Sequence, residues 1–441
     1  MKTPRLAIAD TDGDGLTYGV VTIYAHRDAG EPVVVYSHFA GPQDSQPGTS
    51  AAQFDLQQTM NYLSANPQEI IQMDIPPQVE AARRAKLIEA VKSLAGIGIR
   101  YTVIDVIDHA PHEHWQQLRK AGASLFLTHS GYANKLLIAS MFGSGGKFYE
   151  EWARLGSLFD MAVHEIPGGA SREQVLRIID VDSAFKFAMP KHEEIARYVP
   201  RYGSTGAIAY YITSKNWDVP EFLRFAEELY HKLPPQFKTP EPKDVKYRDA
   251  GYGILADFNE NANVIPRGLI WKTAAKLYLA NDALYTIIYN TPPPPQRQGV
   301  GLIVASNPLR ADEASKKAID EAVREVASRY GVVVVGHLGA LSAIFPPGSN
   351  AADIANEIVA TIERRLTTPK VTHLVNDQLV AETLAKDYQK LHESLRRIEA
   401  KFGEIERLVQ EVEKLRSDVL ERVSAPTVAL EKGAKGPKLG V

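Results

Sequence analysis

The sequence contains no cysteine, and this absence removes several kinds of chemistry at once. Disulfide bonds, thiolate nucleophiles and cysteine-ligated zinc or iron–sulfur centres are excluded. Any metal site must therefore be built from histidine, aspartate and glutamate side chains. Oxygen-rich sites of this kind suit Mg²⁺ or Mn²⁺.

Long hydrophobic runs and an excess of one charge are also missing. No stretch approaches the roughly 20 apolar residues of a membrane span, and no apolar signal segment precedes the run that begins at residue 6. Lysine and arginine together number 50, against 53 aspartates and glutamates, which gives a formal net charge of −3. We therefore expect a soluble cytoplasmic protein with no membrane partner, in which any phosphate group is attracted locally.

The length of 441 residues predicts two or three domains. Up to about residue 170, short apolar runs (6–9, 32–36, 69–73, 99–107 and 123–127) alternate with helix-like stretches such as 79–94 and 131–142. This alternation predicts an α/β fold, with a doubly wound parallel sheet covered by helices on both faces. Ligands of such sheets bind beyond the carboxyl ends of the strands, so acidic residues at those ends are the ones to examine.

The middle of the chain repeats this mixture on a smaller scale. A helical connector is expected over 171–204 and a second, smaller α/β domain over 205–370, with strand-like runs at 285–289, 301–305 and 332–335. The proline run 292–295 predicts a hairpin loop, and a ligand for a proline-binding module is the alternative.

The C-terminal part differs in kind. Apolar residues recur at steps of four and three from Leu384 to Val412, and Leu415, Val419 and Val423 continue the pattern. This heptad seam predicts a coiled-coil helix over 375–424, which would pair with a second copy or with a partner's helix. The alternative is a long helix folded back on its own domain. Residues 425–441 have little to bury and are predicted to be disordered.

Residues 9–19, ADTDGDGLTYG, place three aspartates at alternate positions directly after an apolar run. On an extended strand end, Asp10, Asp12 and Asp14 would point the same way and repel one another unless a cation neutralised them. The alternative is a solvated turn, because Asp and Gly commonly follow strands.

Other acidic residues follow later apolar segments. Asp74 ends the run 69–73 before two prolines, Asp108 and His109 end the β-branched run 101–107, and Asp160 ends the helix-like segment 152–159. Taken singly, each is more often a helix cap or a turn residue. Taken together, they predict carboxylates and an imidazole at one sheet edge, a set that favours Mn²⁺ over Mg²⁺.

In this order, Asp-x-Asp-x-Asp-Gly, a strand-end Asp, Ile-Asp-His and Leu-Gly-x-x-x-Asp resemble the four-motif pattern of the DHH phosphoesterases. DTDGDGLT is most similar to the RecJ exonuclease branch, and the resemblance covers about residues 5–165. The segment GVVVVGHLGALS, which begins at Gly331, is similar to the Gly-Gly-His-x-x-Ala-Ala-Gly motif of the DHHA1 substrate-binding domain in this family. The resemblance implies a DHH catalytic domain over 1–170 and a DHHA1-like domain over 205–370.

The resemblance also implies a mechanism. It is two-metal phosphodiester hydrolysis, in which two divalent ions about 3.5 to 4 Å apart activate a shared water and stabilise charge on the phosphoryl oxygens. Asp74 would bridge both ions, Asp12 and Asp160 would complete the shell of one, and Asp14 with His109 would hold the other. Asp10 would be a ligand or a supporting group, and Asp108 would orient His109 or bind metal directly.

In the second domain, the resemblance implies contacts with substrate phosphate or the terminal nucleotide. The residues concerned are Asn307, Arg310, Gly336, His337 and Gly339. A cleft for single strands would also need basic and aromatic residues. Candidates are Tyr202, Tyr210, Tyr211, Lys246, Tyr247 and Arg248, with ordinary packing as the alternative.

The sequence departs from the family pattern at three positions. Ala110 stands where the family has the second histidine of Asp-His-His, and Val335 and Ser342 replace the first and last glycines of the second motif. His112 and His114 are candidates for a nearby imidazole, and the alternative is that both are exposed loop histidines.

Two classes of function therefore remain open. The first is a Mn²⁺-dependent exonuclease on single-stranded DNA or RNA, with an oligoribonuclease or a cyclic-dinucleotide phosphodiesterase as variants. The second is a catalytically degenerate scaffold or binding protein in a nucleic-acid-processing complex. Retention of the acidic set favours the enzyme, because converging like charges have no use in a dead site.

Overall fold

The structure is a computed structural model that describes residues 5–37, 68–77, 81–293, 298–367, 401 and 407–416. The chain divides into a compact unit up to residue 368 and a second unit over residues 369–441. None of the helices in the described ranges is both long enough and apolar enough to cross a membrane.

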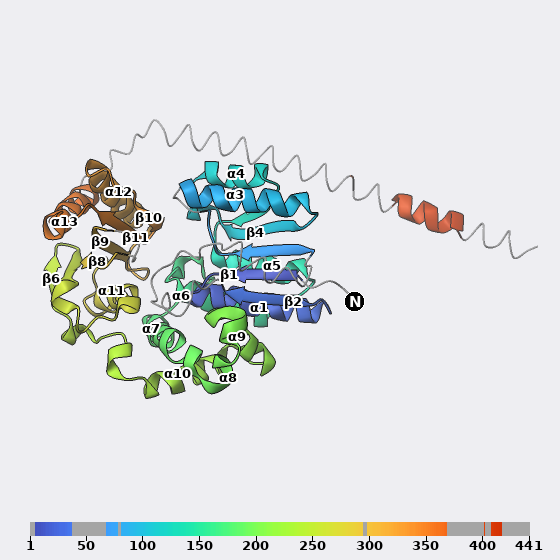
Figure 1. Cartoon of the computed structure of the whole chain (residues 1–441), viewed down its shortest axis with the longest axis horizontal. Coiled ribbons are helices and arrows are strands. Elements are labelled where there is room, and N and C mark those ends of the chain that lie inside the picture. The colour runs from blue at the N-terminus through green and yellow to red at the C-terminus, as the bar shows by residue number, and fades with distance from the viewer. Residues whose placement is uncertain are drawn as a thin grey trace, which may run out of the picture. The chain divides into compact units, whose positions relative to one another are not determined.

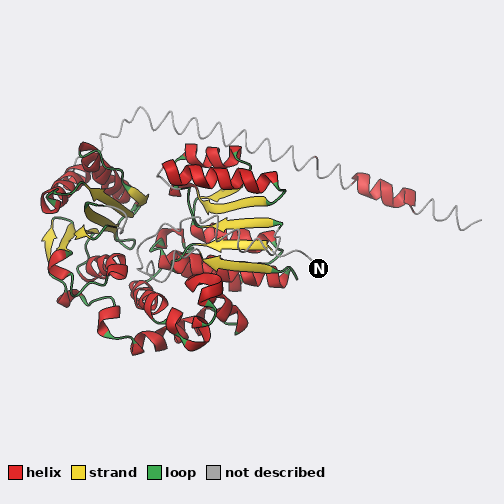
Figure 2. Cartoon of the chain, in the orientation of Figure 1, coloured by secondary structure: helices red, strands yellow, loops and turns green. Residues whose placement is uncertain are grey.

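The first sheet has five parallel strands in the order β2-β1-β3-β4-β5 (Figures 1 and 2). The strands are β1 (Arg5–Ala9), β2 (Val33–Ser37), β3 (Glu69–Met73), β4 (Arg100–Val106) and β5 (Ser124–Thr128). All five coincide with the predicted apolar runs to within a residue or two. Short runs of buried apolar residues, as in β1, β3 and β4, favour strands that are covered on both faces.

Helices cover both faces of this sheet, which confirms the predicted doubly wound fold. They are α1 (Gly13–Asp28), α3 (Ala81–Gly96), α4 (His112–Lys120), α5 (Gly131–Met141) and α6 (Lys147–Phe159). Alternate residues of β1 show the two faces: Leu6 and Ile8 pack in the core beneath α3 and α4, whereas Ala7 and Ala9 pack in the core with α1 and α6. The alternation follows from the two-residue repeat of a strand.

A helical region follows, comprising α7 (Arg172–Phe187), α8 (Glu193–Ala196), α9 (Val199–Ser214) and α10 (Val219–Lys232). Helix α9 packs against α1 and β2. Helical structure therefore continues past residue 204, where the sequence predicted the second domain to begin, because the apolar residues of α9 complete the core of the first sheet.

The second sheet is mixed, in the order β10-β11-β9-β8-β7-β6, with β7 and β8 parallel and the other neighbours antiparallel. Its strands are β6 (Tyr247–Ala250), β7 (Gly253–Asp257), β8 (Tyr285–Thr291), β9 (Val300–Ser306), β10 (Val335–His337) and β11 (Ala340–Phe345). The accompanying helices are α11 (Ile270–Ala280), α12 (Glu313–Arg329) and α13 (Ala351–Thr367). The proline run lies between the antiparallel strands β8 and β9, as the sequence predicts for a hairpin, whereas β10 begins only at Val335, the last residue of the predicted run.

In the second unit, residues 407–416 form a helix. Leu408, Val409, Val412 and Leu415 are exposed on it. Most of the predicted coiled coil over 375–424, and all of the tail 425–441, lie outside the described residues.

Candidate metal centre

The strand order brings the acidic segments to one edge of the first sheet. Strand β1 has β2 on one side and β3 on the other, and β4 follows β3. The chain order reverses at β1, and ligands of open parallel sheets bind outside the carboxyl ends of the strands at such a point. The segments that follow β1, β3 and β4 are therefore expected to build the site.

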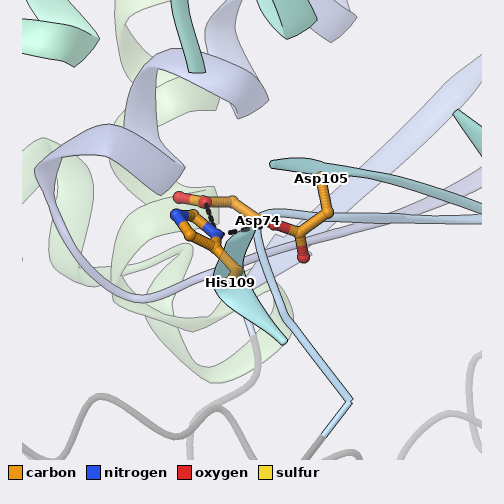
Figure 3. Close-up of side chains that lie close together, drawn as sticks. All are labelled: Asp74, Asp105 and His109. Atoms are coloured by element: carbon orange, nitrogen blue, oxygen red, sulfur yellow. Dashed lines mark hydrogen bonds and ion pairs between the residues drawn. The ribbon is translucent and has the colours of Figure 1, made fainter. Parts of the chain in front are cut away.

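Asp74, Asp105 and His109 converge there (Figure 3). His109 Nδ1 lies 2.7 Å from Asp105 Oδ1 and 3.7 Å from Asp74 Oδ1. One candidate ligand atom from each of the three residues lies within 4.8 Å of the others. This spacing is compatible with one cation bound by all three side chains.

Local backbone structure positions each member of the set. Asp74 follows β3 directly, and its φ of 58° turns the chain sharply before the prolines that follow. Asp105 lies within β4 and is fully buried. The short 3₁₀ helix η1 (Ile107–His109) then folds the chain back, so that His109 meets the residue four positions before it.

The electrostatics of this set favour a bound cation. Burial raises the pKa of the Asp74 carboxyl well above its ordinary value, and the charges of Asp14 and Asp160 raise it further. Burial disfavours the charged form of His109, but the charge and hydrogen bond of Asp105 outweigh this effect, so the pKa of His109 is raised. Buried carboxylates that repel one another are stabilised by a divalent ion.

One oxygen tests directly whether a metal fits. Asp105 Oδ1 accepts the Val106 N–H at 2.7 Å, whereas Asp105 Oδ2 is buried and has no hydrogen-bond partner within the described parts of the chain. Buried polar atoms normally have a partner, and this oxygen is available to a ligand. Two carboxylates and an imidazole fit Mn²⁺ or Mg²⁺, and Asp74, Asp105 and His109 are the residues that would hold it.

The aspartates after β1 do not share one strand face. Strand β1 ends at Ala9, and Asp14 lies within α1, which begins at Gly13, so the three aspartates are not on one continuous strand. Asp10 Oδ1 accepts the Thr11 N–H at 2.6 Å, and Asp12 Oδ1 accepts the Gly15 N–H at 2.7 Å as the N-cap of α1. The glycine-rich segment starts a helix, and the capping role of Asp12 is what an aspartate commonly does there.

Asp14 has a basic partner that the sequence did not reveal. Lys135 Nζ, from α5, lies 2.5 Å from Asp14 Oδ1, and both side chains are buried. The same ammonium donates to Gly131 O at 3.1 Å and lies 3.9 Å from the centre of the Tyr18 ring. Asp14 is thus charge-balanced within the protein.

Asp160 belongs to the same electrostatic environment. It is the C-cap of α6, and burial, followed by the charges of Asp14 and Asp12, raises its pKa well above the ordinary value. Burial and the charge of Asp12 raise the pKa of Asp10 to about 8. Asp10, Asp12, Asp14 and Asp160 therefore lie near the triad without entering it.

Asp108 is placed differently from its predicted role. It is exposed on η1, while His109 points inward to Asp105. The structure therefore brings Asp105, and not Asp108, into the candidate centre. The signal for Asp105 was present in the sequence, since it is the only charge within the β-branched run 101–107.

The other residues near the third motif contribute no ligand to the triad. Ala110 is buried in the apolar core beneath α3 and α4. His112 and His114 lie on α4, where His112 is exposed and contacts Gln116, and His114 is buried with its Nε2 3.6 Å from Glu113.

Comparisons with known proteins give only distant matches. No protein-family model and no curated protein matches the chain. Solved structures that it resembles include the DHH domain of a protein described as a member of a ribosomal-protein family, at 13% identity and a TM-score of 0.44, covering 83% of this chain and 87% of that one. A structure of exonuclease RecJ bound to manganese matches at 14% identity and a TM-score of 0.38, covering 83% of this chain and 92% of that one. A structure of CDC45 from Entamoeba histolytica matches at 8% identity and a TM-score of 0.37, covering 82% of this chain and 95% of that one.

The names of these structures agree with the DHH and RecJ resemblance found in the sequence.

The predicted substrate residues of the second domain are only partly assembled. Asn307 is buried, donates its amide to Ala283 O at 2.9 Å and accepts the Leu309 N–H at 3.1 Å, so it holds its own loop. Arg310 is exposed and pairs with Asp282 at 3.2 Å. Gly336 has a φ of 113°, and a Cβ there would lie 2.0 Å from Ala340 O, so the β10–β11 hairpin requires glycine. Gly339, with a φ of 100°, forms the turn, and His337 ends β10, with its side chain outside what the structure describes.

The aromatic and basic candidates for a nucleic-acid cleft mainly make packing contacts. The ring centroids of Tyr202 and Tyr210 lie 4.1 Å apart, and Tyr211 packs on Trp217 and Phe225. In β6, Tyr247 donates to Asn281 and Arg248 donates to Asn356, and just before β6 the Lys246 N–H donates to Asn261. The packing alternative accounts for these contacts.

Proposed function

We propose that this protein is a divalent-metal-dependent phosphodiesterase that acts as an exonuclease on single-stranded nucleic acid, short oligonucleotides included. The observation that carries the proposal is the buried set Asp74, Asp105 and His109, with Asp105 Oδ2 lacking a partner among the described residues. This set occupies the carboxyl edge of a doubly wound sheet, where such folds bind ligands. The proposal takes Mn²⁺ as the metal.

The protein's contribution is to hold charge and geometry. The hydrogen bond from His109 to Asp105 fixes the orientation of the imidazole, as carboxylate partners of metal-binding histidines do. Asp74 links the triad to the rest of the acidic set, because the charges of Asp14 and Asp160 act on it. We place the second ion of the proposed pair on the side of Asp12, Asp14 and Asp160, with Asp10 in support. Bound divalent ions supply Lewis-acid stabilisation of phosphoryl charge and activation of water.

The test is hydrolysis of end-labelled single strands of two, five and twenty nucleotides, as RNA and as DNA, in Mn²⁺. We expect turnover that is lost on chelation and in Asp74→Ala, and retained in Asp249→Ala, an exposed aspartate on β6. The length series separates an exonuclease from an oligoribonuclease, and a cyclic dinucleotide tests the remaining variant. If the unmodified protein showed no Mn²⁺ binding and no turnover, the proposal that it is an enzyme would be refuted.

The second candidate is a non-catalytic binding protein. Ala110 favours it, because this position packs in the apolar core and offers no imidazole. This candidate predicts binding of single strands without hydrolysis at any length in Mn²⁺ or Mg²⁺. Turnover that Asp74→Ala abolishes would exclude it.

A further inference from the structure

A buried lysine on α12 contacts the segment that follows Asp160. Lys316 lies near the start of α12 and is only 6% exposed. Its Nζ lies 3.3 Å from Nδ1 of His164, on the 3₁₀ helix η2 (Val163–Glu165) that follows Asp160. His164 itself is exposed.

This ammonium is poorly satisfied. A lysine ammonium has three donors, and among the described residues Lys316 has one hydrogen-bond acceptor, an imidazole nitrogen. A buried cation is costly unless anionic groups compensate it. Glu165 and Glu313 act on it only through their charge.

Lys316 is electrostatically connected to the metal centre through Glu165. The Glu165 charge acts on Lys316 and on His109 alike. Glu165 Oε2 accepts from the Tyr132 N–H at 3.3 Å and from Ser157 Oγ at 3.2 Å, which holds the carboxylate beside Asp14 and Lys135. The second sheet also reaches this region, because β10 contacts η1, the turn that carries His109.

A second group, without a partner in the described ranges, lies at the same turn as Lys316. Ser306, at the end of β9, is 5% exposed, and its Oγ has no hydrogen-bond partner in the described part of the chain. A Cβ placed on Gly339 would lie 3.9 Å from Ser306 Cβ and 4.0 Å from Lys316 Cδ. The β10–β11 turn is therefore flanked by a lysine with spare donors and a hydroxyl without a partner.

We infer that Lys316, together with Ser306, forms an anion subsite that binds a phosphate group of the nucleic-acid strand. This inference rests on the proposed function and assigns the phosphate contact of the second domain to Lys316. Arg310, which the family resemblance favoured, is instead exposed and paired with Asp282. An ammonium and a hydroxyl are ordinary ligands for phosphate oxygens.

The experiment measures binding of a fluorescent five-nucleotide DNA with phosphorothioate linkages to the full chain in Mn²⁺, by anisotropy. Lys316→Met should weaken binding about tenfold and reduce the slope of log K against log salt by about 0.7, because one phosphate contact is lost. Lys317→Met is the matched control, since Lys317 is the exposed neighbour on the same helix, and should change binding less than twofold. Ser306→Ala should weaken binding about threefold.

Failure of the inference is distinguishable from failure of the proposed function. Mn²⁺ stoichiometry, measured in parallel, should be the same in Lys316→Met as in the unmodified chain. The subsite would be overturned if both Lys316→Met and Ser306→Ala bound the DNA normally. It would also be overturned if only Arg310→Met lost binding. Either result would leave the proposal of a Mn²⁺-dependent nuclease intact. If Lys316→Met does not fold, Ser306→Ala decides: weakened binding supports the subsite and unchanged binding overturns it.

Discussion

Lys135 Nζ and Asp14 Oδ1 lie 2.5 Å apart, and both side chains are buried beneath the acidic edge of the first sheet. Burial lowers the pKa of a lysine, but the charges of Asp14 and Asp74 outweigh burial here, and the pKa of Lys135 is raised. The lysine is thus a permanent internal cation among carboxylates whose own pKa values are raised. This pairing explains how the protein tolerates so many aspartates at one place without depending on a metal for each.

The first prediction concerns this pair. Lys135→Met should reduce the free energy of unfolding by about 3 to 5 kcal/mol, because it leaves the Asp14 carboxylate buried and unpaired. The double variant Asp14→Asn with Lys135→Met should recover part of the loss, since no unpaired charge remains. Denaturant unfolding in chelator measures both. Lys92→Met, an exposed position on α3, is the control, and a Lys135→Met variant as stable as this control would contradict the prediction.

The second prediction separates two aspartates of the third motif. Asp105→Asn should weaken Mn²⁺ binding about 10- to 100-fold, because it removes an oxygen ligand and weakens the hold on His109. Asp108→Asn should leave the affinity nearly unchanged, since Asp108 is exposed and outside the triad. Isothermal titration of the metal-free protein gives both affinities. The reverse order of effects would restore the assignment made from the sequence.

Much of the first domain could be predicted because its signals are local. The apolar runs at 6–9, 69–73 and 123–127 form strands, since a short apolar run bounded by turn residues is typical of a strand in a parallel sheet. Asp74 and His109 were found because they follow such runs directly. Asp105 was missed because the acidic ligand was expected after the end of the strand and not within it. The fold of η1, which brings His109 back to Asp105, also depends on tertiary packing.

Contacts between distant segments could not be predicted in the same way. Lys135 and Asp14 are 121 positions apart, and Lys316 and His164 are 152 apart, so no periodicity relates either pair. The start of the region around the second sheet was also harder to predict, because the apolar residues of α9 could cover either sheet. Its assignment to the first sheet follows from packing against α1 and β2.

The third prediction uses the glycine that makes room for the buried pair. A Cβ on Gly156 would lie 2.3 Å from Asp14 Oδ1 and 2.5 Å from Lys135 Cε. Gly156→Ala should therefore lower the free energy of unfolding by about 1 to 3 kcal/mol through overpacking. Gly145→Ala is the matched control, because nothing lies within 4 Å of its Cβ position. Equal melting temperatures for the two variants would show that the pair can shift without cost.

The fourth prediction is the pH dependence of the metal-free protein. The folded-state pKa of Asp10 is about 8, against an ordinary value of 3.8, and those of Asp12, Asp74 and Asp160 are also raised, in each case by burial first. A carboxyl whose pKa is raised on folding favours the folded state most below its unfolded pKa and loses that contribution as pH rises toward the folded pKa. The melting temperature in chelator should therefore fall from about pH 5 to about pH 8.

Excess Mn²⁺ should flatten or reverse this fall, because a bound cation favours the ionised carboxylates. Asp10→Asn should make the melting temperature in chelator depend less steeply on pH. Thermal melts of this variant at several pH values measure this dependence. A melting temperature in chelator that rises over this range, or the same slope in Asp10→Asn, would show that the carboxylates are already ionised in the metal-free fold.

The last prediction concerns the C-terminal helix. On residues 407–416, Val409, Val412 and Leu415 are 52% to 63% exposed, and these three residues belong to the heptad seam. Apolar side chains in this pattern are stabilised when a second helix covers them, so we propose that the seam joins two copies of the chain. Light scattering should give a smaller assembly for a chain that ends at Thr367. Val412→Glu should have the same effect in the full chain by placing a charge in the seam, whereas Lys414→Glu, on the same helix but outside the seam, should not. If neither truncation nor Val412→Glu changes the particle mass, the coiled coil does not hold copies of the chain together. The helix would then bind a different partner.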